Sequence, residues 1–265
     1  MKFSIIIPAH NEEKRMSQMK TLEEYGKFFE RLKMNKEIVN FEILVVLNGC
    51  KDKTIEVVKK AEKKFAEIRH IEFEQSGKGF AIIEGLKNAL KRDFDAIGFV
   101  DADMATPPLA FYKMIKQIEK CDAVIANRWD KKSHVKRSFG KWIRSRGFNI
   151  LIRALFLFPY RDTQCGAKVF RKRVIEEILP FLDVTKWAFD VCLLYWVRKK
   201  KFYICGVPTI WEDREGSNIG LSFRKSLKTS VQMATAAVRL RIVNSPFKKI
   251  VKLYDLLPEK MKMHH

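Results

Sequence analysis

The sequence contains no Cys-x-x-Cys pair, and its cysteines are scattered along 265 residues at Cys50, Cys121, Cys165, Cys192 and Cys205. This scatter argues against both a disulfide framework and a structural zinc site. We therefore expect reduced, cytoplasmic thiols that mostly fill the core.

Long apolar runs are also missing. A membrane-spanning helix needs about 20 apolar residues. The longest candidate, residues 150–158, is short and contains Arg153. Met1 and Lys2 lead directly into an expected strand, so we expect no secretory signal. The run at 150–158 is compatible with a helix that lies on a membrane without crossing it.

Acidic residues are few relative to basic ones. There are 31 Asp and Glu against 52 Lys and Arg, which gives a formal charge of +21. Such a charge attracts nucleic acid, anionic lipid headgroups or phosphorylated substrates. The sequence has no helix-turn-helix, zinc-finger or RNP-type aromatic motif, and its positive charge concentrates in the second half. We therefore predict no nucleic-acid partner.

What is present is an alternation of apolar strands and helices. Strands are expected at residues 3–7, 41–47, 68–73, 96–100 and 123–126, with a helix between each successive pair. This order predicts an α/β fold with a mostly parallel sheet covered on both faces. Residues 166–170 and 203–207 are expected as edge strands around a helix at 187–198. We divide the chain into a domain at 1–220 and a basic, amphipathic helical tail at 221–265.

The most informative motif is Asp101-Ala102-Asp103, which follows the strand at 96–100 and precedes Pro107-Pro108. Ligands of open α/β sheets bind beyond the carboxyl ends of the strands. Two carboxylates one residue apart can hold Mg²⁺ or Mn²⁺, whose other positions go to phosphate oxygens. The alternative is a solvated loop, but the position at a strand end favours a metal-dependent nucleoside-diphosphate site.

Two further loops offer groups to an anion. Gly77-Lys78-Gly79 is expected as a flexible loop in which the backbone approaches a phosphate and Lys78 supplies a charge. The alternative is an ordinary turn with a solvated lysine. Pro8 to Glu12 offers backbone and polar groups at the end of the first strand, although a helix start capped by Asn11 explains it nearly as well.

Taken together, these segments resemble the family 2 inverting glycosyltransferases, which have the GT-A fold. The resemblance is carried by Pro8–Glu13, Asn48–Thr54, Gly77–Gly79 and Asp101–Asp103. Two more specific motifs are similar to those of dolichyl-phosphate β-glucosyltransferases, namely Arg161–Gly166 and Trp187–Val191. The likeness continues through Arg214–Ser217 into the basic tail.

The resemblance implies inverting transfer of a sugar, with glucose expected first, from a UDP-sugar to a dolichyl or polyprenyl phosphate. Two alternatives stay open: a hydroxyl acceptor on a glycan, with Asp190 as the base, and mannosyl transfer from GDP-mannose. Asp101 and Asp103 would bind Mg²⁺ or Mn²⁺. Ala105 stands where the related mannosyl enzymes have a further metal ligand.

For the donor, the resemblance implies nucleotide-sugar contacts from the strand-end loops, the acidic motif and a closing loop. The residues are Pro8, Ala9, Asn11, Glu12, Asn48, Lys78, Asp101, Ala102, Asp103, Arg214 and Ser217. Asn48 replaces the aspartate that usually recognises the base, and an amide is still able to pair with uracil.

The acceptor phosphate is already ionised and needs cations rather than a base. Its candidate ligands are Arg128, Arg137, Arg144 and Arg146, since a guanidinium binds phosphate with two bonds. Arg128 is the strongest candidate because it directly follows a predicted strand. The catalytic candidates are Asp103, Arg128 and Asp190, and Asp190 either orients the arginines or caps local structure.

Residues 142–158 and the tail from Phe223 interleave apolar and basic residues. Helices of this kind lie at a bilayer interface or pack on their own core. For residues 142–158 both interpretations stand, and for the tail we favour contact with an anionic membrane. We expect a peripheral protein on the cytoplasmic face of a membrane.

Overall fold

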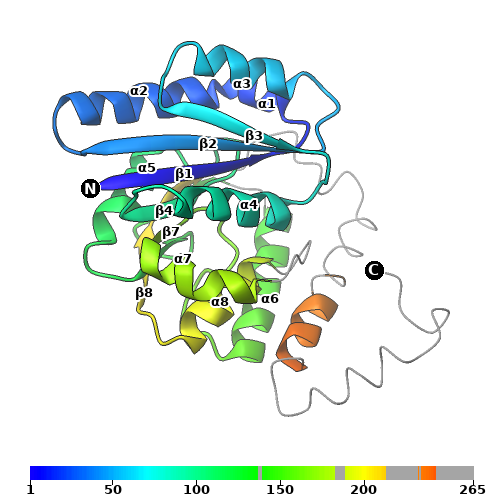
Figure 1. Cartoon of the computed structure of the whole chain (residues 1–265). Helices are drawn as coiled ribbons and strands as arrows, with labels where there is room; N and C mark the ends of the chain where they lie inside the picture. Colours follow the sequence, from blue (N-terminus) through cyan, green and yellow to red (C-terminus); the bar gives the residue numbers. More distant parts are fainter. Residues whose placement is uncertain (137–138, 183–188, 213–231, 233, 243–265) are drawn as a thin grey trace.

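The structure is a computed structural model that describes residues 1–136, 139–182, 189–212, 232 and 234–242, apart from the side chains at 139, 141 and 144. Figure 1 shows a central sheet with helices on both sides. The main sheet has seven strands in the order β3-β2-β1-β4-β7-β5-β8, and β6 and β9 form a two-stranded sheet.

The bounds of the elements are as follows. The strands are β1 (Lys2–Ala9), β2 (Asn40–Asn48), β3 (Ile68–Phe73), β4 (Ala96–Phe99), β5 (Ala123–Asn127), β6 (His134–Lys136), β7 (Lys168–Arg171), β8 (Ile204–Pro208) and β9 (Ile210–Glu212). The helices are α1 (Glu13–Met19), α2 (Thr21–Met34), α3 (Thr54–Glu62), α4 (Lys78–Leu90), α5 (Pro108–Gln117), α6 (Phe139–Phe156), α7 (Lys172–Ile178), the short 3₁₀ helix η1 (Leu179–Phe181) and α8 (Phe189–Lys199). Residues 234–242 are also helical.

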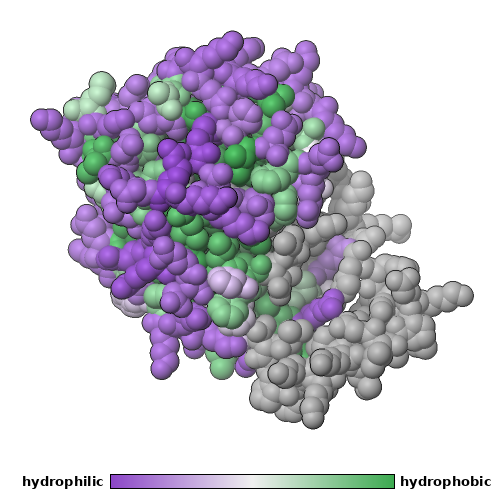
Figure 2. All heavy atoms as spheres, viewed as in Figure 1, coloured by the Kyte–Doolittle hydropathy of each residue, from purple (hydrophilic) through white to green (hydrophobic). Residues whose placement is uncertain are grey.

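Two apolar cores lie on opposite faces of the sheet, because side chains alternate between the faces along each strand. Ile5 and Ile7 belong to the core under α2, α3 and α5, whereas Ile6 belongs to the core under α4, α7 and α8. On the face seen in Figure 2, residues over α2 and α3 are mostly hydrophilic, and apolar residues gather in the middle, beside α4 and α7. The predicted α/β fold, with both faces of a mostly parallel sheet covered, is confirmed.

The prediction that residues 166–170 form an edge strand is wrong. β7 lies inside the sheet and pairs antiparallel with both β4 and β5. A short apolar segment does not reveal its neighbours, because strand position depends on contacts far apart in the sequence. The prediction of an edge strand at 203–207 is confirmed by β8, which ends the sheet.

The first strand runs past its predicted end, because Pro8 does not stop it. Val100 N donates to Ile6 O, so the even-numbered residues of β1 turn their backbone groups toward β4. β4 ends at Phe99. No residue of β4 lies opposite Pro8, so the absence of an N–H at this proline costs the sheet no hydrogen bond.

The segment Gly77-Lys78-Gly79 is not a flexible loop. Gly77 is the N-cap residue of α4, and Lys78 and Gly79 already belong to its first turn. Gly77 has a φ of 145°, a conformation that favours glycine. Lys78 is consequently held on a helix.

Cys121 and Cys205 form a disulfide, which corrects the expectation that all cysteines are reduced. Cys205 lies opposite Val124 in the parallel pairing of β8 with β5, and this pairing brings the two cysteines together across 84 residues. Their spacing in the sequence gave no sign of this contact. Cys50, Cys165 and Cys192 form no disulfide among the described residues.

The described part of the tail also differs from the expectation. In residues 234–242, Ala237 and Leu240 are buried in the core under α4, α7 and α8, while Val238 is exposed. The alternative of packing on the domain therefore holds for this stretch. The boundary at residue 220 and the rest of the tail lie outside the described residues. No helix in the described part of the chain is long and apolar enough to span a membrane.

We predict that breaking the disulfide destabilises the fold by up to about 4 kcal/mol, because the bridge closes a long loop. Cys121→Ser should unfold at a lower temperature than the wild type, and a reductant should lower the wild-type midpoint to the same value. Cys192→Ser controls for the loss of a buried sulfur. A midpoint unaffected by both the reductant and Cys121→Ser would contradict the prediction.

Candidate nucleotide-sugar site

Polar residues gather where β1, β2 and β4 end, at the carboxyl edge of the sheet. Ala9 lies opposite Leu47, and Ile6 lies opposite Phe99, so the loops after these strands leave the sheet side by side. The first turn of α4 meets the same edge, where Lys78 forms an ion pair with Asp101. This is the place at which open α/β sheets bind ligands.

Asp101 and Asp103 form the acidic centre of this edge. Burial raises the pKa of Asp103, and the negative charge of Asp101 raises it further. Burial also acts to raise the pKa of Asp101, but the positive charge of Lys78, supported by Lys168 and Arg128, outweighs it and lowers that pKa. Two carboxylates that repel each other in this way favour the binding of a cation.

Lys78 supplies a cation to this centre from within the protein. Its Nζ contacts Asp101 Oδ1, and 41% of its side chain remains exposed. Burial lowers the pKa of Lys78, but the charges of Asp101, Asp190 and Asp103 raise it overall. The ammonium therefore stays charged beside the acidic centre, within reach of a phosphate bound there.

The loop that carries the acidic centre is held from α2. Thr21 Oγ1 donates to Ala102 O at 3.0 Å, and Tyr25 Oη donates to Thr106 O at 2.7 Å. Asp103 Oδ1 accepts a hydrogen bond from Ala105 N at 3.0 Å. These bonds fix the direction of the loop and leave the second carboxylate oxygen of Asp103 for a ligand.

Gly166 forms a wall of the acidic centre. A Cβ atom at this position would lie 1.9 Å from Asp101 Oδ2. Any side chain here would displace the carboxylate, so the position requires glycine for close packing and not for backbone conformation. Residue 166 lies two positions before the start of β7, and the place of β7 inside the sheet brings residue 166 to the end of β4.

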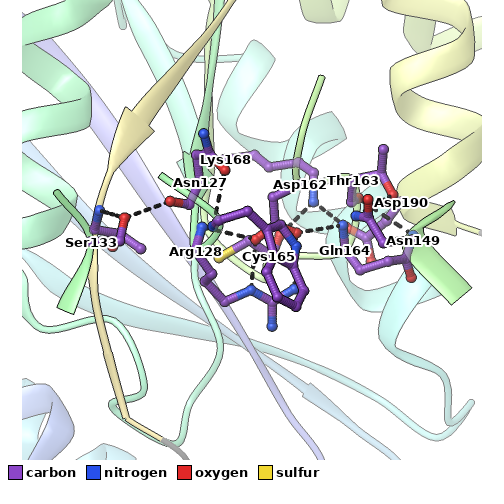
Figure 3. Close-up of polar contacts among 12 residues, drawn as sticks. Asn127, Arg128, Ser133, Asn149, Asp162, Thr163, Gln164, Cys165, Lys168 and Asp190 are labelled. Carbon is purple, nitrogen blue, oxygen red and sulfur yellow. Dashed lines mark hydrogen bonds and ion pairs between the residues drawn. The ribbon is translucent and has the colours of Figure 1, made fainter. Parts of the chain in front are cut away.

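Arg128 is held by Asp162 in a buried, two-pronged ion pair (Figure 3). Arg128 Nε and Nη2 donate to Asp162 Oδ2 and Oδ1 at 2.7 and 2.9 Å, and Arg128 N also donates to Oδ2 at 3.0 Å. The side chains of Arg128 and Asp162 are only 9% and 0% exposed. Much of the Arg128 guanidinium is thus already engaged, and its role as a phosphate ligand stays a prediction.

Asp190 is joined to Lys168, a fully buried lysine of β7 (Figure 3). Lys168 Nζ donates to Asp190 Oδ1 and to Cys165 O, both at 2.5 Å. Asp190 also lies near enough to Lys78 to act on its pKa. Among the described residues Asp190 therefore pairs with a lysine, Lys168, and not with one of the candidate arginines.

Asn48 ties the strand-end loops together. Its Nδ2 donates to Ala9 O at 2.8 Å, and its Oδ1 accepts a hydrogen bond from Gly77 N at 3.0 Å. The Nδ1–H of His10 donates to Asn48 O at 2.6 Å. Recognition of a base by the Asn48 amide stays a prediction, and it would require these bonds to be exchanged.

The first loop is built differently from the capping alternative. Asn11 has a φ of 54°, and its Oδ1 accepts a hydrogen bond from Lys51 N at 2.7 Å. Glu12, not Asn11, is the N-cap residue of α1. Burial raises the pKa of Glu12, its ion pair with Arg15 opposes this, and the negative charges of Asp103 and Asp101 add to the increase. Pro8 and Ala9 are buried in β1.

Of the remaining predicted residues, the structure describes the side chain of Arg146. Arg146 is exposed on α6, with Cζ 4.7 Å from the ring centre of Trp129. Arg137, Arg214, Ser217 and the side chain of Arg144 lie outside the described residues.

The sequence model described as "Glycosyl transferase family 2" matches residues 4–179, about two thirds of the chain. The chain belongs to this family. The transferase is 32% identical to a dolichyl-phosphate β-glucosyltransferase of Dictyostelium discoideum, over 90% of this chain and 73% of that protein. It is 30% identical to the human protein of the same name, over 82% and 69% of the two chains.

Solved structures support the fold. The transferase matches glucosyl-3-phosphoglycerate synthase from Mycobacterium tuberculosis, a complex with Mn²⁺, UDP and glucosyl-3-phosphoglycerate, with a TM-score of 0.64 at 18% identity, over 91% of this chain and 79% of the other. It also matches TarS of Staphylococcus aureus in complex with UDP-GlcNAc, with a TM-score of 0.56 at 17% identity, over 95% and 69% of the two chains. The GT-A fold implied by the sequence motifs is confirmed.

The donor set of the transferase fits a divalent cation that is shared with phosphate. Among the residues the structure describes, no three or more His, Cys, Asp or Glu side chains form a metal-binding group. Asp101 and Asp103 provide two carboxylates, and Mg²⁺ is usually held by one or two carboxylates together with substrate phosphates and water. Because Gly166 has no side chain, the Asp101 carboxylate can occupy its position beside the backbone of residue 166.

Sequence reasoning missed the roles of Asp162, Gly166 and Lys168. Asp162 and Gly166 stand in the motif Arg161–Gly166, which indicated a family but no contact. The motif itself was the available signal, because a loop sequence typical of one subfamily indicates that the loop contacts the functional site. Lys168 gave a second signal, as a lysine inside an apolar strand needs a buried partner.

We predict that Gly166→Ala weakens metal binding, because the added Cβ displaces the Asp101 carboxylate. Manganese affinity in the presence of UDP, measured by electron paramagnetic resonance, should fall at least about tenfold. Gly206→Ala is the control, since its Cβ would meet only Asn127, at 3.5 Å or more. Unchanged affinity in a folded Gly166→Ala protein would show that the wall is not needed.

Proposed function

We propose that this transferase moves glucose from a UDP-sugar to a dolichyl or polyprenyl phosphate with inversion. The observation that carries the proposal is the presence of a donor centre and an arginine at one edge: the loop that packs Gly166 against Asp101 also carries Asp162, which binds Arg128. The names of the relatives support glucose and the lipid phosphate. The UDP complex of the matched synthase supports the donor.

At the donor end, a divalent cation on Asp101 and Asp103 would neutralise charge on the departing diphosphate. Lys78, released from Asp101, would bind the same phosphates. Its ammonium is held beside the acidic centre before any ligand arrives. Little reorganisation is then needed as negative charge builds on the leaving group.

At the acceptor end, an ionised phosphate oxygen attacks the anomeric carbon without help from a base. Within the described residues, Arg128 uses Nε and Nη2 for Asp162, which leaves Nη1 for the acceptor phosphate. Asp190 is engaged by the buried ammonium of Lys168. This engagement favours a phosphate acceptor over the alternative in which Asp190 activates a hydroxyl.

We predict that Asp103→Asn abolishes transfer while the fold persists. Product formed from radiolabelled UDP-glucose and a polyprenyl phosphate should fall about 100-fold or more. Chelation of divalent metal should have the same effect on the wild type. Asp93→Asn is the matched control, since that side chain is 87% exposed and pairs with Lys2.

Full activity of Asp103→Asn would remove the acidic centre from the mechanism. Transfer from GDP-mannose but not from UDP-glucose would favour the mannosyl alternative. Transfer to a glycan hydroxyl but not to a lipid phosphate would overturn the acceptor assignment.

The proposed function includes attachment to the surface of a membrane through α6. One side of this helix packs on the core through Ile152 and Phe156. The opposite side, together with Leu157 just beyond the helix, exposes a row that we call the α6 apolar strip: Ile143, Ile150, Leu151 and Leu157. Both interpretations of residues 142–158 are thus supported, each on a different side of the helix.

An apolar strip beside basic residues suits an anionic membrane, where the apolar side chains enter the interface and the cations meet headgroups. A peripheral position would bring a lipid-borne phosphate to the acceptor end of the site. The cytoplasmic face is proposed because a nucleotide-sugar donor is expected in the cytoplasm.

We predict that Ile150→Asp combined with Leu157→Asp reduces binding to vesicles of anionic phospholipid about tenfold or more. Binding is measured by flotation. Met34→Asp serves as the control, because Met34 is 72% exposed at the end of α2, away from α6. Equal flotation of the double variant and the wild type would show that the strip does not bind the membrane.

A further inference from the structure

Two contacts between an arginine and a tryptophan meet at the adjacent residues 128 and 129, just after β5. Arg128 Cζ lies 5.2 Å from the ring centre of Trp211, and Arg146 Cζ lies 4.7 Å from that of Trp129. The ring centres of Trp129 and Trp142 are 6.1 Å apart, in an edge-to-face arrangement. We call these five residues the Trp–Arg platform. Chemistry at the donor end makes no use of its aromatic rings.

The platform adjoins the acidic centre. Glu212 N donates to Ala105 O at 3.2 Å, so β9, which carries Trp211, lies against the loop of Asp103. Arg128 is bound by Asp162, and the same loop packs Gly166 against Asp101. A molecule bound along the platform therefore has one end at the place where the sugar is transferred.

The other end of the platform opens to the outside. Trp142 and Arg146 are four residues apart on α6, so they lie on the same side of the helix. Trp142 is 42% exposed, and its neighbour Ile143 begins the α6 apolar strip. The platform thus runs from a buried cation to an exposed aromatic ring beside an apolar surface.

We propose that the Trp–Arg platform binds the phosphate and the first isoprene units of a prenyl phosphate acceptor. The phosphate lies on Arg128 and Arg146, and the hydrocarbon lies on the rings of Trp129 and Trp142. Trp211 stacks against Arg128 and keeps its guanidinium in place. The inference rests on the proposed function and adds to it the residues that distinguish a prenyl phosphate from other phosphates.

The chemistry of the platform matches an amphiphile. Guanidinium groups bind phosphate, and tryptophan rings bury large apolar areas at little cost in side-chain freedom. A small phosphorylated metabolite would contact the arginines but would not cover the tryptophan rings. A membrane surface alone would need the exposed Trp142 but not the ring of Trp211, which packs against the core.

The test compares farnesyl phosphate with butyl phosphate, both in solution below micelle formation and without vesicles. This choice separates acceptor recognition from membrane attachment. Binding is measured by equilibrium dialysis with UDP and Mn²⁺ present, and transfer is measured with UDP-glucose. We expect the wild type to bind farnesyl phosphate at least about tenfold more tightly than butyl phosphate.

Trp142→Ala should remove most of this preference while leaving the affinity for UDP unchanged. Arg146→Gln should weaken the binding of both phosphates alike. Trp196→Ala on α8 is the matched control, because Trp196 stacks on Phe181, outside the platform. Since Trp142 and Arg146 are exposed, both variants are expected to fold, and thermal unfolding checks this.

A wild type that binds both phosphates equally, or a folded Trp142→Ala protein that keeps the preference, would overturn the inference. In either case transfer to a polyprenyl phosphate still reports on the proposed function separately. A wild type that binds farnesyl phosphate but transfers no sugar to it would overturn the proposed function and leave the platform as a binding site.

Discussion

The position of β7 inside the sheet is the constraint on which the site depends. This strand pairs with β4 on one side and β5 on the other. Because it runs antiparallel to both, the residues that precede it meet the ends of both neighbours. Gly166 thereby reaches Asp101 at the end of β4, and Asp162 reaches Arg128 at the end of β5. An edge position would have separated these pairs.

The charged residues of the site are arranged as ion pairs. Three cations, Lys78, Arg128 and Lys168, each form an ion pair with a carboxylate: Asp101, Asp162 and Asp190 respectively. A buried charge without a partner is costly, so each carboxylate keeps a cation in the interior when no substrate is bound. The two pairs whose cations are proposed to bind substrate, Lys78–Asp101 and Arg128–Asp162, differ in burial and in the number of contacts. Lys78 is 41% exposed and makes a single contact, whereas Arg128 makes a buried, two-pronged one.

Sequence reasoning reached the fold because the apolar strands alternate regularly with helices, and it proposed the acidic centre because Asp101 and Asp103 stand one residue apart directly after a strand. It failed where a contact joins distant segments. The disulfide joins Cys121 to Cys205 across 84 residues, and no local pattern marks it. Lys168 appeared as part of an apolar strand, and its partner Asp190 lies on another helix. The local sequence pattern predicts helices and strands well. The pairing of buried charges depends on the order of the strands in the sheet, and that order was predicted only in part.

The charge arrangement also bears on the kind of acceptor. A diphosphate donor and a phosphate acceptor together bring several negative charges into one edge of the sheet. Repulsion between them would oppose binding unless cations were already in place, because screening by water is weak in a buried site. A hydroxyl acceptor would instead need a carboxylate free to take its proton. The structure offers the first arrangement. Its lysines and its best-placed arginine are held ready in ion pairs, and Asp190, the carboxylate expected to serve as a base, is tied to a buried ammonium. These cations, together with the divalent ion proposed for Asp101 and Asp103, are thus better matched to an anionic acceptor than to a neutral one.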